Sequence, residues 1–122
     1  MHTVQIWNAT RGRLLAGSVE IAETSWSRMR GLLGRRGMSA GEGLWIRPSS
    51  GVHTIGMSFA IDVIGLDRKG YVVKLWNDLV PGRMTSLSWR LCSVLELPSG
   101  TIVSSGTQLG DALHSEPIDY VC

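Results

Sequence analysis

Short runs of alternating apolar and polar residues dominate the chain, and they predict strands. Val4, Ile6 and Asn8 alternate with Gln5 and Trp7, which is the two-residue period of a strand with two different faces. Further apolar runs stand between turns rich in glycine, proline and serine. We therefore expect more strands over residues 14–21, 44–47, 52–57, 59–66, 71–76 and 92–97, and a last short strand that opens at 110–111.

One segment changes from the strand period to helical spacing. Thr24 is a suitable N-cap, and Trp26, Met29 and Leu33 follow it three to four residues apart. The pattern predicts one short α-helix over about residues 24–33. A helix of this length depends on packing its apolar stripe against a sheet.

The spacing of turns sets the expected architecture. Residues 67–70 form a turn signal between two strong strand candidates, which predicts a hairpin. Residues 77–90 read as a long irregular connection, and residues 101–105 as a single helical turn. Many short strands with one small helix predict a mainly β protein, a small antiparallel β-sandwich or closed barrel, with residues 1–122 as a single domain.

Two carboxylates interrupt the apolar runs. Asp62 and Glu96 each lie among mostly apolar neighbours in a predicted strand. An ionised carboxylate in such a layer must be paired, hydrogen-bonded several times, or protonated. The available partners are His53, Arg30 and backbone N–H groups. Two interpretations stay open: these residues line a ligand site, or Asp62 braces a turn or loop through hydrogen bonds.

The sequence gives little support to a metal site or to a serine nucleophile. His2, His53 and His114 lie far apart in the chain, so we expect no metal site and no cofactor. Residues 56–60 differ at one position from the G-x-S-x-G motif of a serine nucleophile. That motif requires a sharp turn from strand to helix, whereas a strand is expected to continue beyond Ser58.

A run of arginines surrounds a G-x-x-G segment. Arg28, Arg30, Arg35 and Arg36 flank residues 31–34, in a pattern that one RNA-binding module uses to clamp a backbone. In that module the two central residues face solvent, but here they are leucines suited to a core. We therefore do not expect nucleic acid binding, and a pocket for a carboxylate or phosphate ligand remains an alternative.

Composition narrows the function classes. The 122 residues are 43% apolar, which excludes a disordered chain, and the net charge of +2 gives no general attraction to nucleic acid. The five tryptophans suit core packing. Trp89 lies in the long connection, where it could instead line a groove for a sugar or a peptide.

The cysteines and the N-terminus indicate the cellular compartment in which we expect the protein. Cys92 and Cys122 lie far apart and Cys122 is the final residue, so we expect two free thiols. The first residues lack the basic start and apolar run of a secretion signal. The longest apolar-leaning stretch, residues 55–66, is too short to span a bilayer. These features favour a cytoplasmic protein without a membrane span.

Four segments together resemble a known family. R-G-L-L-G-R at 30–35, H-T-I-G-M-S-F-A-I-D-V at 53–63, L-D-R-K-G-Y-V-V at 66–73 and V-L-E-L-P-S-G at 94–100 are similar, in this order and spacing, to the bacterial and archaeal family called domain of unknown function 192. The resemblance covers about residues 20–111. It implies a small, mainly β domain with a short helix and no established activity. Many members carry an export signal or lipid anchor, which we do not expect on this chain.

The motif residues of that family coincide with those selected by physical argument, namely Arg30, His53, Met57, Asp62 and Glu96. We expect these five to form a ligand-binding site in a non-enzymatic binding or accessory module, with a small molecule or a protein as its partner. One alternative is a structural or interaction subunit that acts through a sheet edge or an apolar patch. The other is a small hydrolase that uses His53 with Asp62 or Glu96.

Overall fold

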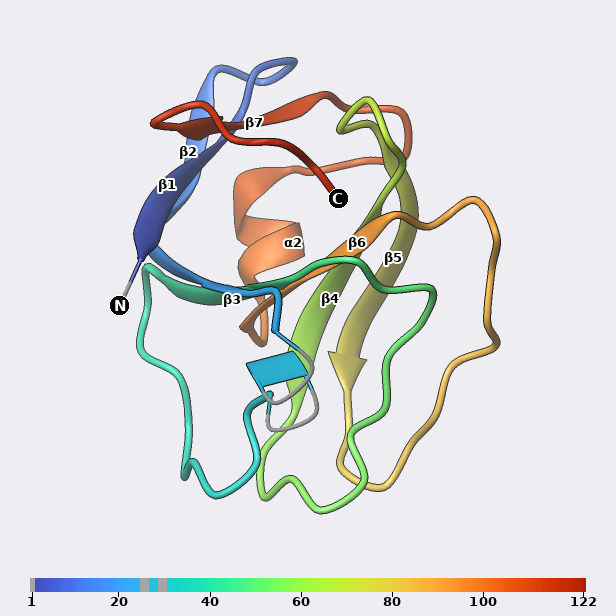
Figure 1. Ribbon diagram of the computed structural model, residues 1–122. Helices are drawn as coiled ribbons and strands as arrows, with labels where there is room; N and C mark the ends of the chain where they lie inside the picture. The colour runs from blue at the N-terminus through green and yellow to red at the C-terminus, as the bar shows by residue number, and fades with distance from the viewer. Residues whose placement is uncertain (1, 25–26, 29–30) are drawn as a thin grey trace.

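The computed structural model describes residues 2–24, 27–28 and 31–122. Within these residues, seven strands form one curled sheet, a half-barrel with the short helix α2 inside its curve (Figure 1). The elements in chain order are β1 (Thr3–Asn8), β2 (Arg13–Ala22), β3 (Glu42–Ile46), β4 (Ile61–Leu66), β5 (Val72–Leu79), β6 (Ser93–Pro98), α2 (Thr101–Ser105) and β7 (Leu113–Glu116).

The sheet is mostly but not wholly antiparallel. Its strand order is β5-β4-β6-β3-β2-β1-β7, and β2 and β3 pair in parallel, with Ser18 opposite Glu42. The expectation of an antiparallel sheet is therefore wrong at this one pair. Parallel neighbours require a crossover of about a dozen residues or more, and residues 23–41 provide it.

The half-barrel is not clearly a closed barrel or a sandwich, which corrects the finer part of the predicted fold class. The edge strands are β5 and β7. They approach at one end, where Tyr71 forms a bridge with Ala112 and the N–H of Val72 donates to the carbonyl of Asp111 at 2.8 Å. Among the described residues β5 and β7 share no ladder, so the sheet remains open.

Apolar side chains pack on both faces of the sheet. Alternation along β6 places Leu95 and Leu97 in the cluster that also contains Ile102 of α2, and Val94 in a second cluster with Val63 of β4. The first cluster fills the concave side. The second is covered by three long irregular segments, residues 31–41, 47–60 and 80–92, which gather at the end of the half-barrel away from β7 (Figure 1).

The helix expected at 24–33 falls partly on residues outside the described ranges. Its start is confirmed where it is described: the N–H of Ser27 donates to Oγ1 of Thr24 at 3.0 Å, and the N–H of Arg28 donates to the carbonyl of Thr24 at 2.9 Å. Residues 31–34 form turns rather than a last helical turn. The single helical turn expected at 101–105 is confirmed as α2.

The strand expected over residues 52–57 is wrong. This segment is irregular apart from a bridge between His53 and Met84. The reason is local: buried Thr54 uses its Oγ1 to donate to the carbonyl of Val80 at 2.7 Å and to accept from the N–H of Arg83 at 2.9 Å. These bonds join two loops instead of continuing a ladder.

Among the helical segments that the structure describes, none has the length and apolar character of a membrane-spanning helix.

Candidate functional site

Asp62 is held in the core by backbone N–H groups. The N–H of Asp78 donates to its Oδ1 at 2.8 Å. The N–H groups of Gly100 and Ile102 donate to its Oδ2 at 3.1 and 2.8 Å. The residue before α2, Gly100, has no side chain to cap the helix, so the carboxylate of a neighbouring strand takes that role. Asp62 therefore braces the start of α2.

Asp62 and Glu96 point to opposite faces of the sheet. In the ladder between β4 and β6, Asp62 lies opposite Leu97, and Val63 lies opposite Glu96. Directly opposite residues share a face, and successive residues alternate. Asp62 therefore faces the side of α2, whereas Glu96 faces the loops at the other side. The predicted group of five residues is divided by the sheet itself.

Three of the predicted residues meet in one cavity, the Glu96 cavity, of about 170 Å³. His53 and Met57 reach it from the irregular segment before β4, and Glu96 reaches it from β6. Much of the remaining wall is apolar, with Leu32, Leu33, Ile46 and Val52. Asp62 does not line this cavity, and Arg30 lies outside the described residues.

Glu96 is the most perturbed ionisable group at this cavity. The residue is 3% exposed, and burial raises the pKa of its carboxyl from the ordinary 4.5 to about 8. No described residue forms a hydrogen bond or a salt bridge with its side chain. At neutral pH the favoured form is therefore the neutral carboxylic acid, which both donates and accepts a hydrogen bond.

Arg28 adds a cation that sequence reasoning did not include among the five. It lines the cavity, and its Nη1 donates to the carbonyl of Pro48 at 3.1 Å. Its Nε is buried, and no acceptor for it is found among the residues that the structure describes. The signal was present in the sequence, because Arg28 belongs to the arginine run around the G-x-x-G segment.

His53 is exposed and its imidazole forms no hydrogen bond with a described carboxylate. Neither Asp62, on the other face, nor buried Glu96 orients it as a general base would require. The described residues also contain no group of three or more His, Cys, Asp and Glu side chains able to hold a metal ion.

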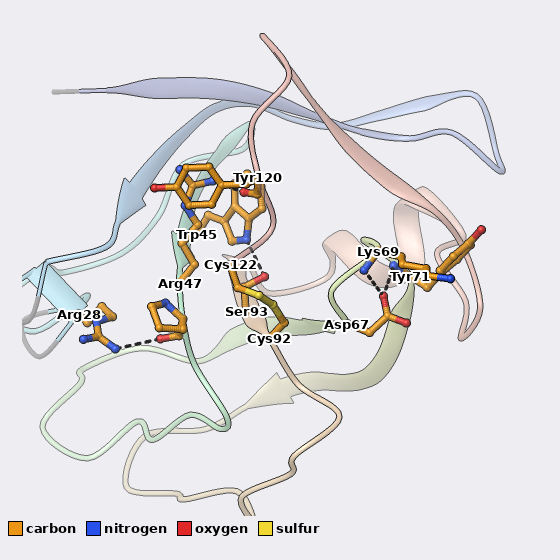
Figure 2. The surroundings of a disulfide bond; sticks show 11 residues. Arg28, Trp45, Arg47, Asp67, Lys69, Tyr71, Cys92, Ser93, Tyr120 and Cys122 are labelled. Atoms are coloured by element: carbon orange, nitrogen blue, oxygen red, sulfur yellow. Dashed lines mark hydrogen bonds between the residues drawn. A yellow bond between two sulfur atoms is a disulfide. The ribbon is translucent and has the colours of Figure 1, made fainter.

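The cysteines are joined, which corrects the expectation of two free thiols. Cys92 and Cys122 form a disulfide with their Cα atoms 5.5 Å apart. The C-terminal segment contacts Arg47, which is 1% exposed: its Nη1 donates to the carbonyl of Tyr120, and its Nη2 lies 3.1 Å from Oδ1 of Asp119. Figure 2 shows its guanidinium beside the rings of Trp45 and Tyr120, at 4.7 and 4.1 Å from their centroids. The expectation failed because it assumed a frayed last residue.

Comparison with known proteins agrees with the motifs. The model of the family called domain of unknown function 192 (DUF192), described as Uncharacterized ACR, matches residues 6–115. No curated protein matches the chain.

Two solved structures are similar over most of their length. One, from Sinorhizobium meliloti 1021 and named as a candidate transcription regulator, is 24% identical, with 95% of this chain and 94% of that chain covered and a TM-score of 0.78. The other, a protein of unknown function from Novosphingobium aromaticivorans DSM 12444, is 23% identical, with coverage of 92% and 83% and a TM-score of 0.77. At these identities the likeness shows the fold alone. Since the family model spans nearly the whole chain, this protein belongs to the DUF192 family.

Proposed function

We propose that this protein is a non-enzymatic binding module that takes a small organic molecule into the Glu96 cavity. The observation that carries the proposal is the convergence of His53, Met57 and Glu96, from separate segments, on one cavity. Two of these side chains are polar and the surrounding wall is largely apolar, which is the usual composition of a ligand pocket.

The size and chemistry of the cavity define the ligand class. A volume of about 170 Å³ suits a compact molecule, since an apolar cavity of roughly 150 Å³ accommodates benzene. The apolar wall favours a mainly apolar body. Neutral Glu96 favours a group that exchanges hydrogen bonds with a carboxylic acid, such as an amide, a hydroxyl or a ring nitrogen.

The test is a thermal-shift screen of small polar-apolar compounds, followed by paired variants. His53→Ala and Met57→Ala remove cavity residues, whereas His114→Ala and Met84→Ala remove the same residue types at exposed positions outside it. A compound at about 100 times its Kd stabilises the wild type by about 2.7 kcal/mol. We expect this gain to persist in the two controls and to fall sharply in the two cavity variants. Equal gains in all four variants would place the ligand elsewhere.

A second candidate function is self-association through exposed apolar side chains. Met84 and Leu87, in the loop after β5, are 72% and 80% exposed, and such residues favour contact with another protein surface. Sedimentation at high concentration tests this function, with Leu87→Glu as the disruptive variant. A wild type that stays monomeric at millimolar concentration would reject it.

A further inference from the structure

A second and larger cavity, the basic groove, lies beside the disulfide and has a volume of about 710 Å³. Four of its lining side chains are cations: Arg28, Arg68, Lys69 and Arg90. They come from three separate parts of the chain. Figure 2 shows Arg28 and Lys69 on opposite sides of the disulfide, and both residues line the groove.

These four cations are not neutralised within the described residues. Other arginines of this chain, such as Arg11, Arg35 and Arg47, form salt bridges, but the four in the groove do not. The acidic side chain in the lining is Asp67. Its Oδ1 accepts the N–H groups of residues 69 and 71, each at 2.9 Å, and thereby fixes the hairpin turn.

One further observation favours a ligand rather than a merely solvated basic surface. Trp89 lines the same groove and is 93% exposed. An exposed indole next to guanidinium groups offers a flat face on which a planar ring can stack.

We propose that the basic groove binds a small phosphorylated ligand that carries a flat ring, the chemistry of a mononucleotide. The phosphate lies among the cations, because guanidinium and ammonium groups donate strong charge-assisted hydrogen bonds to phosphate oxygens. The ring stacks on Trp89. This site is separate from the Glu96 cavity apart from the wall that Arg28, Pro48 and Ser49 share, and it does not depend on the function proposed above.

The experiment is calorimetric titration of the full chain with AMP, GMP, CMP and UMP, and separately with ribose 5-phosphate and with adenosine. We expect at least one nucleotide to bind, and both fragments to bind at least about ten-fold more weakly than that nucleotide. Binding should weaken as salt rises, since the contacts are ionic. Absence of binding by all four nucleotides would overturn the proposal, and so would ribose 5-phosphate that binds as tightly as the nucleotide.

Matched variants locate the site. Arg68→Gln with Arg90→Gln removes two charges from the groove, and Arg13→Gln with Arg36→Gln removes two exposed charges that do not line it. We expect the first pair to weaken nucleotide binding by about ten-fold or more and the second to leave it within about two-fold. Trp89→Leu should also weaken the nucleotide but leave ribose 5-phosphate unchanged. An equal loss of nucleotide affinity in both charge variants would show general attraction to a basic protein and would refute the groove as the binding site.

Discussion

Glu96→Gln isolates the effect of placing an ionisable carboxyl inside this protein. Glutamine has nearly the same volume and keeps hydrogen-bonding capacity, but it does not titrate. The variant therefore removes the proton equilibrium of residue 96 and leaves the packing of β6 nearly unchanged.

The magnitude follows from the two pKa values. In the unfolded chain the carboxyl loses its proton near the ordinary 4.5, whereas in the folded protein it keeps it until about 8. Between these values the folded state binds more protons than the unfolded state, so the free energy of unfolding falls as pH rises. The difference in pKa corresponds to about 5 kcal/mol. This contribution is fully present below pH 4.5, is lost progressively up to pH 8, and changes no further above it.

The assay is urea unfolding of wild type and Glu96→Gln in steps from pH 4.5 to pH 9. Subtracting one free energy from the other removes the titration of every group that the two proteins share. We expect the wild type to lose stability relative to Glu96→Gln across this window, and Glu96→Gln to be the more stable protein at pH 9.

A difference that stays constant with pH, or a wild type that gains stability relative to the variant, would refute the reasoning. Either result would mean that Glu96 is ionised in the folded protein and stabilised by a partner. The Glu96 cavity would then present a carboxylate rather than a neutral acid, and its expected ligand class would change to cations.

Three other variants test the fold. Asp62→Asn places an amide NH₂ against N–H groups at the start of α2, and we expect a loss of about 3 kcal/mol in urea unfolding. Gly65→Ala puts a Cβ against Cδ2 of buried Leu91, which should cost about 1–3 kcal/mol by the same measurement; an unchanged midpoint would mean that Leu91 moves freely. Cys92→Ser with Cys122→Ser opens the loop closed by the disulfide, whose ends are separated by 30 positions in the sequence, and should cost about 3–4 kcal/mol. Reductant should destabilise the wild type alone.

Strands were predictable where the pattern is local. The strands predicted over residues 59–66, 71–76 and 92–97 correspond to β4, β5 and β6 within a few residues. They were predictable because the two-residue period and the flanking turns depend on residues that are neighbours in the chain. The run at 52–57 has the same apolar character. It failed as a strand because Thr54 bonds to a loop about thirty residues later, which no local pattern reveals.

The burial of the two carboxylates was predictable from the sequence, but their geometry was not. Polar side chains in apolar runs marked Asp62 and Glu96 correctly as buried, at 1% and 3% exposure. Whether two such residues meet depends on strand register, and a shift of one residue moves a side chain to the other face. The register of β4 against β6 places them on opposite faces of the sheet, so Asp62 braces the start of α2 and Glu96 lines a cavity.

By itself the sequence determined that the chain is mainly β, that its hairpin turns at 67–70, and that two carboxylates are buried. These features rest on side-chain period, turn chemistry and the cost of burying charge, all of which act between near neighbours. The tertiary structure decided the parallel pair of β2 and β3, the open half-barrel, and the bond between Cys92 and Cys122. Each joins segments far apart in the chain, and their pairing follows from how the whole core packs.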